Sequence, residues 1–242
     1  MLEFTGNPIE PQRDTWDWGE IRAIPLDLSD EKLVSVSYLP EKMVVGPQYF
    51  IQQLPGAKAD IFVRETIQQK LNDAADMLPY GYKLVIFDAW RDIDTQQALF
   101  DRMQSFVQRD HPEFNADQTL AATLRIVALP SSNANRPSPH NTGGSVDVSI
   151  VDERGRLLEM GSPFDDISAR AKTTYYEFEP ESEAVIKIRE NRRLLYHVMT
   201  NAGFTNYLEE WWHYDYGNQN WAFMSGQDTA FYGATKPEFP WL

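Results

Sequence analysis

The stretch SVDVSIV, residues 145–151, alternates between polar and β-branched apolar side chains as far as Ile150. A period of two predicts a β-strand that turns Val146, Val148 and Ile150 to one face. Asp147 then lies on the opposite face, between two serines. The stretch therefore predicts a strand with one apolar layer, and it fixes a single carboxylate on the side away from that layer.

A loop rich in Pro, Ser and Asn, residues 129–142, precedes this strand and carries His140, one of 4 histidines in the chain. Gly143 and Gly144 join the loop to the strand and let the backbone bend there. Two interpretations fit His140 and Asp147 taken alone. They are a structural histidine beside a surface aspartate, or they are two ligands of one metal ion.

The residues before this loop predict three helices and a strand. In segment 60–78, apolar side chains recur at spacings of three and four, which predicts a helix. The segment KLVIFDA, residues 83–89, predicts a buried strand. Segments 94–109 and 115–128 predict two further helices, each capped by the aspartate or asparagine that begins it.

The residues after the strand predict a long helix and a last strand. Segment 182–202 has the longest helical pattern, with Ser182 as its N-cap and Gly203 just past its end. The segment NYLEEWWHYDYG, residues 206–217, predicts the final strand. This order contains too few β-α units for a doubly wound sheet. We therefore predict an α+β fold, with helices packed against a mostly antiparallel central sheet.

The length of 242 residues fits one domain with a sizeable core. We expect residues 1–242 to form a single domain whose core is segment 60–217. Residues 1–58 are predicted to be irregular, apart from a candidate strand at 32–39. Residues 218–242 form an aromatic C-terminal tail, which we expect to pack on the body.

The composition excludes several kinds of site and partner. Aspartate and glutamate total 36 against 22 lysines and arginines, and the net charge of −14 disfavours nucleic acid and anionic membranes as partners. Cysteine is absent, so a metal site must be built from His, Asp and Glu. The sequence shows neither a transmembrane segment nor a secretory signal, and we expect a cytoplasmic protein. Its oligomeric state is not predicted.

The segment EWWH, residues 210–213, places a carboxylate three residues before a histidine. Zinc peptidases combine a histidine that binds the metal with a glutamate that takes a proton from the metal-bound water. In a regular strand, Glu210 and His213 point to opposite faces, so a bulge or twist would have to re-aim one of them. The alternative is a solvated glutamate beside a histidine at the sheet edge.

The two segments together make a more specific set than either alone. His140, Asp147 and His213 are two histidines and one carboxylate, and three protein ligands leave a fourth tetrahedral position for water, as catalytic zinc requires. Glu210 would lie outside the metal shell as a general base. Arg91, directly after the predicted strand 83–89, has two possible roles. It can pair with a neighbouring aspartate, or it can stabilise the oxyanion of a tetrahedral intermediate.

These residues resemble the D-alanyl-D-alanine dipeptidases of the VanX type, a family of zinc dipeptidases, over about residues 60–217. The zinc segment of the family, S-x-H-x-x-G-x-x-x-D, matches SPHNTGGSVD at 138–147, and its E-W-W-H matches residues 210–213 unchanged. The arginine segment, roughly D-G-Y-R-P, corresponds to DAWRD, with Asp92 in place of the proline. Further similarity lies in MGSPFD at 160–165 and in NRRLLYHVMTNAGF at 191–204.

The resemblance implies a hedgehog-type D,D-peptidase fold with one zinc ion per chain. The implied zinc ligands are His140, Asp147 and His213. Glu210 would be the catalytic base, and Arg91 would polarise the scissile carbonyl. Asp165 would hold the free amino group of the substrate, which favours a dipeptidase over a carboxypeptidase, and Ser138 would line the pocket. The family also has an N-terminal tyrosine in the pocket wall, for which Tyr38 or Tyr49 are the candidates.

The function implied by the resemblance is zinc-dependent hydrolysis of D-Ala-D-Ala or a related small dipeptide. One alternative is a peptidoglycan D,D- or L,D-carboxypeptidase or endopeptidase of the same fold, which would have a wide, open cleft. The other is a non-catalytic binding module that contains zinc. The presence of both Glu210 and Arg91 argues against the binding module, because a structural zinc needs no base. His111 and His197 have no such context and are assigned structural roles.

Overall fold

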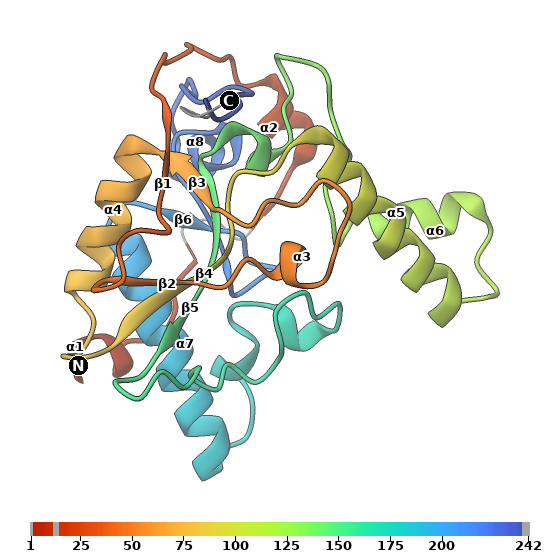
Figure 1. Cartoon of the computed structure of the whole chain (residues 1–242). Coiled ribbons are helices and arrows are strands. Elements are labelled where there is room, and N and C mark those ends of the chain that lie inside the picture. The colour runs from red at the N-terminus through yellow and green to blue at the C-terminus, as the bar shows by residue number, and fades with distance from the viewer. Residues whose placement is uncertain (1, 12–14, 239–242) are drawn as a thin grey trace.

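Strand β5 (Ser145–Val151) is the middle strand of a five-stranded sheet with the order β2-β4-β5-β7-β6 (Figure 1). The computed structural model describes residues 2–11 and 15–238. Parts of the predicted N-terminal segment and tail, residues 1, 12–14 and 239–242, lie outside the described chain. The other strands of this sheet are β2 (Met43–Val45), β4 (Lys83–Asp88), β6 (Thr205–Asn206) and β7 (His213–Asp215).

The predicted α+β class is confirmed, and the central sheet is mostly antiparallel. Strand β5 runs antiparallel to both neighbours, β4 and β7, and β6 pairs antiparallel with β7. The β2–β4 pair is parallel, so the sheet is mixed. A separate antiparallel pair joins β1 (Leu33–Ser35) to β3 (Phe62–Arg64).

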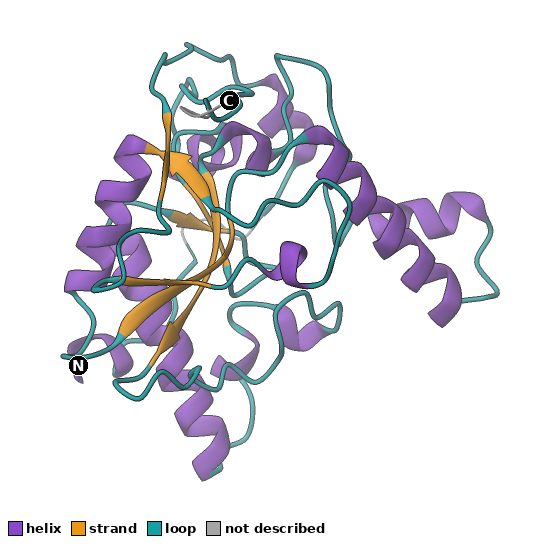
Figure 2. Cartoon of the chain, in the orientation of Figure 1, coloured by secondary structure: helices purple, strands orange, loops and turns teal. Residues whose placement is uncertain are grey.

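Both faces of β5 are buried. Val146, Val148 and Ile150 belong to the main hydrophobic core, as the alternation predicts, and so does Val151 at the end of the strand. Helices α4 (Glu65–Asp76) and α7 (Glu183–Asn201) lie together on one side of the sheet and add apolar side chains to the same core (Figure 2). The three polar side chains of the other face, Asp147 among them, are covered as well. One strand therefore carries the apolar core and a buried polar layer.

The long helix follows its sequence signals closely. The side chain of Ser182 accepts a hydrogen bond from the backbone N–H of Val185, which begins α7 at Glu183. Gly203 follows the helix with a φ of 96°, in the left-handed region that favours glycine after a helix. Helix α6 (Ala116–Thr123) begins as predicted, with Asn115 in a capping box, but it ends before residue 128.

The predicted cap at Asp94 is wrong by two residues. The side chain of Asp92 accepts a hydrogen bond from the backbone N–H of Thr95 at 2.7 Å, and α5 (Ile93–Asp110) starts directly after it. Asp92 also lies 3.4 Å from the ammonium group of Lys58. The position where the family has a proline is therefore used for capping, and proline is likewise well suited to the start of a helix.

Two predicted elements are divided in the structure. Segment 60–78 begins with β3, and α4 starts only at Glu65, because Val63 pairs with Val34 of the other strand in the small sheet. Segment 206–217 is not one strand. It consists of the short strands β6 and β7, joined by a turn at residues 207–212. In both cases pairing with a distant strand overrides the local pattern.

The terminal segments contain more structure than predicted. The described part of residues 1–58 includes β1, β2 and three short helices. The described part of the tail contains one helix and, beyond that helix, the buried Tyr232. None of the described helices is long and apolar enough to cross a membrane. The additional helices are α1 (Leu2–Thr5), α2 (Trp18–Ala23), α3 (Gln48–Ile51), α8 (Gln219–Ser225) and the 3₁₀ turns η1 (Pro139–Thr142), η2 (Ala169–Ala171) and η3 (Tyr175–Glu177).

The central position of β5 gives a testable consequence for stability. Ile150 is 0% exposed, so we expect Ile150→Ala to lower the free energy of unfolding by about 2–5 kcal/mol through lost burial and a residual cavity. Ile51 is 59% exposed, and Ile51→Ala should change stability by less than about 0.5 kcal/mol. Urea unfolding followed by circular dichroism measures both variants. Equal losses would show that β5 is not part of the core.

Candidate metal centre

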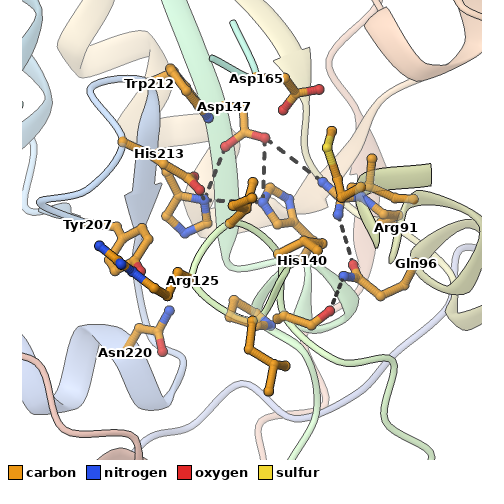
Figure 3. Close-up of a pocket in the computed structure, with 18 of the residues that line it drawn as sticks. Arg91, Gln96, Arg125, His140, Asp147, Asp165, Tyr207, Trp212, His213 and Asn220 are labelled. Carbon is orange, nitrogen blue, oxygen red and sulfur yellow. Dashed lines mark hydrogen bonds and ion pairs between the residues drawn. The ribbon is translucent and has the colours of Figure 1, made fainter. Parts of the chain in front are cut away.

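Three side chains predicted as metal ligands meet on the polar face of β5 (Figure 3). Asp147 and His213 are directly opposite each other in the antiparallel β5–β7 pair, which brings their side chains together on one face. His140 comes from η1, the 3₁₀ turn that leads into β5. Gly143 ends this turn with a φ of 71°, a conformation that glycine adopts without strain.

The separations between the ligand atoms fit a tetrahedral ion. Nε2 of His140 lies 3.2 Å from Nδ1 of His213, which in turn lies 3.1 Å from Oδ1 of Asp147. Nε2 of His140 lies 3.5 Å from Oδ2 of Asp147. Zinc with ligands at about 2.0–2.1 Å in tetrahedral geometry holds them about 3.3 Å apart. The distances of 3.2, 3.1 and 3.5 Å between these nitrogen and carboxylate oxygen atoms are close to that separation.

The hydrogen bonds on the far side of each ring direct a lone pair toward the same point. Nδ1 of His140 lies 2.7 Å from the carbonyl oxygen of Ala89, so this nitrogen donates and Nε2 is left with a lone pair. Nε2 of His213 lies 3.1 Å from Oδ2 of Asp215, so it donates and Nδ1 is left with a lone pair. The lone pairs of the two imidazoles and the carboxylate of Asp147 thus face one another. A bound cation would accept electron density from all three groups.

The electrostatics of this position also favour a positive charge. Burial by itself lowers the pKa of His213, but the carboxylates of Asp215 and Asp147 outweigh it and raise that pKa well above its usual value. Asp215 is held in turn by hydrogen bonds from Ser145 and Asn218 at 2.6 and 2.7 Å. Among the residues that the structure describes, this is the one group of His, Asp and Glu with metal-ligand spacing.

Glu210 lies beside this group because of the turn between β6 and β7. The backbone N–H of Glu210 donates to the carbonyl of Tyr207 at 3.0 Å, and the N–H of His213 donates to the carbonyl of Glu210 at 3.3 Å. The turn places Oε2 of Glu210 3.9 Å from Nδ1 of His213. In a regular strand Glu210 and His213 would point to opposite faces, and a bulge or twist was expected to bring them together. The structure brings them together with a turn instead.

Burial raises the pKa of Glu210 to about 8, although the nearby His213 acts in the opposite direction. A carboxyl group with a pKa near the working pH can both accept and return a proton, which is what general acid–base catalysis needs. Its neighbour Glu209 instead forms an exposed ion pair with Lys172. The two adjacent glutamates thus have different environments, and only Glu210 lines the cavity at the metal group.

Arg91 forms an ion pair with a neighbouring aspartate, which is one of its two predicted roles. Its guanidinium donates to Oδ2 of Asp88 through Nε at 3.1 Å and Nη2 at 2.6 Å, and it donates to Gln96 at 2.8 Å. It also lines the cavity, with Nη2 at 3.9 Å from Oδ2 of Asp147. Burial opposes its charge, but Asp88 and the other nearby acids raise the pKa of Arg91 further. The side chain is charged, buried and rigidly held.

Asp165 and Tyr49 also line this cavity, next to Arg91. The hydroxyl of Tyr49 donates to Oδ1 of Asp165 at 3.1 Å, and the guanidinium of Arg91 lies 4.6 Å from the centre of the Tyr49 ring. Burial, with the charge of Asp147, raises the pKa of Asp165 to about 7. Tyr38, the other candidate tyrosine, is 75% exposed. Of the two, Tyr49 is the one placed in the cavity wall.

Ser138 does not line this cavity. The cavity at the metal group has a volume of about 80 Å³ and includes Trp18, Tyr207 and Trp212 in its wall. Ser138, the residue before η1, lines an adjoining cavity of about 220 Å³ instead.

The two histidines assigned structural roles lie outside the metal group. The ring of His111 is half exposed next to Glu113, at 3.3 Å. Nε2 of His197 lies 3.0 Å from the carbonyl oxygen of Asn7.

The site contains residues that the sequence reasoning missed. Asp215 holds His213 in place and Gln96 holds Arg91, and neither was singled out. Asp88, the other partner of Arg91, was one of the two neighbouring aspartates, with Asp92, that the sequence offered for pairing. A signal existed for Asp215, because it follows His213 by two residues and therefore shares its face of the strand. Gln96 had no such signal, since only the packing of α5 on the site brings it to Arg91.

Comparison with known proteins gives a consistent family. The sequence model of a family described as D-ala-D-ala dipeptidase matches residues 49–234. The match thus extends beyond segment 60–217 in both directions, and it includes Tyr49 and α8. Within residues 1–58 it leaves α2 outside.

Curated relatives carry the name D-alanyl-D-alanine dipeptidase. The protein from Synechocystis sp. is 32% identical over 194 residues, which is 71% of this chain and 78% of that protein. The protein from Escherichia coli K12 is 28% identical over 135 residues, covering 56% of this chain and 55% of the relative. The protein from Enterococcus faecalis is 26% identical over 135 residues, covering 55% and 62%.

The bond between His213 and Asp215 gives a prediction about metal binding. We expect Asp215→Asn to weaken zinc binding about 10- to 100-fold, because an amide no longer fixes the Nε2–H tautomer of His213. Asp152→Asn is the matched control, since Asp152 is buried but binds Arg156 away from the site. Competition with a chromogenic zinc chelator measures both affinities. An unchanged affinity of Asp215→Asn would contradict this positioning role.

Proposed function

The chain belongs to the D-Ala-D-Ala dipeptidase family, and we propose that it is a zinc-dependent dipeptidase that hydrolyses D-Ala-D-Ala or a closely related small dipeptide. One observation carries the proposal. Two histidines and an aspartate bring ligand atoms within 4.8 Å of one another, beside a glutamate whose pKa is raised to about 8.

The metal in this proposal is held by Nε2 of His140, a carboxylate oxygen of Asp147 and Nδ1 of His213. Two imidazoles and one carboxylate are a ligand set that suits zinc, and three protein ligands are typical of catalytic rather than structural zinc sites. When bound, the ion supplies Lewis acidity, which polarises the peptide carbonyl and makes water a stronger acid.

Glu210 is the general base in this proposal. Its carboxylate takes a proton from the attacking water and delivers it to the amine that leaves when the peptide bond breaks. The turn at residues 207–212 supports this role, since it holds the carboxylate beside His213 without making it a metal ligand. The raised pKa supports it further, because a proton accepted by Glu210 is retained long enough to be passed on.

Arg91 stabilises the negative charge that develops on the carbonyl oxygen. A fixed, buried cation needs no reorganisation during the reaction, and the bonds to Asp88 and Gln96 provide that rigidity. Asp165 binds the free amino group of the substrate, with Tyr49 fixing the carboxylate from the side. The ammonium group itself favours the ionised form of Asp165. Ser138 lines the adjoining cavity and has no part in holding the amino group in this proposal.

The position of Asp165 supports a short substrate. Asp165 lines the same cavity as the three candidate metal ligands, so a free amino group held by its carboxylate lies close to the scissile bond. This favours a dipeptide over the longer substrates of the peptidoglycan carboxypeptidase or endopeptidase alternative. The positions of Glu210 and Arg91 in the same cavity argue against a non-catalytic binding module.

The direct test of the function is a substrate panel. We expect zinc-loaded protein to hydrolyse D-Ala-D-Ala, to lose that activity with a chelator, and to regain it when zinc is restored. L-Ala-L-Ala is the stereochemical control, and amine release measured by ninhydrin quantifies both. Failure to hydrolyse any dipeptide in the zinc-loaded state would overturn the proposal.

The role of Glu210 is tested by a matched pair of variants. Glu210→Ala should lower kcat about 10²- to 10⁴-fold, while one zinc per chain is still bound, because the base is not a ligand. Glu209→Ala removes the neighbouring carboxylate from its exposed pair with Lys172 and should keep nearly full activity. Steady-state kinetics and metal analysis of both variants decide the assignment. Substantial turnover by Glu210→Ala would mean that another group is the base.

A further inference from the structure

The adjoining cavity has a wall that does not come from the family-matched part of the chain. It has a volume of about 220 Å³ and shares Trp18, Ala128, Pro139 and Asn220 with the cavity at the metal group. Trp18 and two more of its lining residues belong to α2, which precedes the matched residues 49–234. Whatever this cavity recognises is therefore determined in part by residues that lie outside the family-matched segment.

A buried hydroxyl in this cavity has no partner. The side chain of Ser138 is only 4% exposed, and its Oγ forms no hydrogen bond with any described residue. Buried hydroxyls in folded proteins are almost always satisfied, because an unmade hydrogen bond costs about 1–3 kcal/mol. Since Ser138 lines the cavity, a ligand in the cavity is in a position to supply the missing partner.

The charge of the cavity is opposite to that of the protein. Arg22 and Arg136 line it, and neither forms an ion pair with a residue that the structure describes. The guanidinium of Arg22 lies 5.6 Å from the centre of the Trp18 ring, so its charged group makes a cation–π contact and not an ion pair with a carboxylate. No described acidic side chain lines this cavity, although the net charge of the chain is −14.

The second cavity adjoins the end of the first cavity that lies away from Asp165. In Figure 3, Asp165 and Asn220 lie at opposite ends of the cavity, with His140, Asp147 and His213 between them. A substrate whose amino group binds Asp165 therefore extends past the metal group toward Asn220, which the second cavity shares. The end of the substrate that reaches the second cavity is its C-terminal residue.

We propose that this second cavity is a subsite for a carboxylate on the C-terminal residue of the substrate, so that the enzyme prefers dipeptides ending in an acidic amino acid. Arg22 and Arg136 would pair with the side-chain carboxylate, and the hydroxyl of Ser138 would donate to the same residue. This inference rests on the proposed dipeptidase function for the direction of the substrate. A local cationic subsite is needed because the remainder of this acidic protein repels an anionic ligand.

The kinetic test compares isosteric substrates. We expect zinc-loaded protein to show a kcat/KM for D-Ala-D-Glu at least about fivefold above that for the neutral D-Ala-D-Gln, mainly through KM. The ratio should fall as ionic strength rises, because exposed charges are screened. In Arg22→Gln/Arg136→Gln the ratio should approach one. The charge-matched control is Arg109→Gln/Arg154→Gln, two exposed arginines outside both cavities, and it should keep the wild-type ratio.

A tripeptide distinguishes the source of the carboxylate. If Arg22→Gln/Arg136→Gln also lowers kcat/KM for D-Ala-D-Ala-D-Ala, the subsite accepts the carboxylate of a chain terminus as well as that of a side chain. That result supports a carboxylate site. A ratio near one for the wild-type protein, or a preference that survives Arg22→Gln/Arg136→Gln, would overturn the proposal.

A binding measurement separates this inference from the proposed function. Calorimetry with zinc-loaded Glu210→Ala compares D-Ala-D-Glu and D-Ala-D-Gln without turnover, and the acidic dipeptide should bind at least about fivefold more tightly. Preferential binding combined with no hydrolysis by the wild-type protein would overturn the dipeptidase function and leave the subsite standing. Equal binding of the two dipeptides would overturn the subsite, whatever the activity.

Discussion

Asp147 is a carboxylate that is 2% exposed in the middle strand of the central sheet, and much of the surrounding structure compensates that one buried charge. A buried carboxylate is costly unless it is paired and hydrogen-bonded. Here His213 lies opposite on β7, His140 approaches from η1, and the guanidinium of Arg91 lies 3.9 Å away. Asp147 and the two histidines that help to compensate its charge are also the group with metal-ligand spacing.

The groups around Asp147 are in turn held by a second layer of polar contacts. Asp215 fixes the tautomer of His213, the carbonyl of Ala89 fixes that of His140, and Asp88 with Gln96 holds Arg91. Ligand direction and charge are therefore set before any metal or substrate arrives. Such preorganisation matters for catalysis, because groups that are already in position need not reorganise during the reaction.

The fold separates the tasks of stability and chemistry between the two faces of β5. The apolar face packs against α4 and α7 in the main core, and the polar face is covered by the turns and loops that carry the site. Residues of the site come mostly from strand ends and turns, where side chains are free to converge. The rigid sheet beneath them keeps their separations within the narrow range that a small ion requires.

The sequence by itself determined the elements and residues whose signals are local. The period-two alternation placed Asp147 opposite an apolar layer, Ser182 and Gly203 marked the ends of α7, and ordered motifs picked out the three candidate ligands. Only the tertiary structure decided that residues 207–212 form a turn, that β3 precedes α4, and that Tyr49 rather than Tyr38 reaches Asp165. It also placed Ser138 in a second cavity bounded by α2. The physical reason is that these features depend on contacts between residues far apart in the chain, and strand pairing and burial at such contacts override local preference.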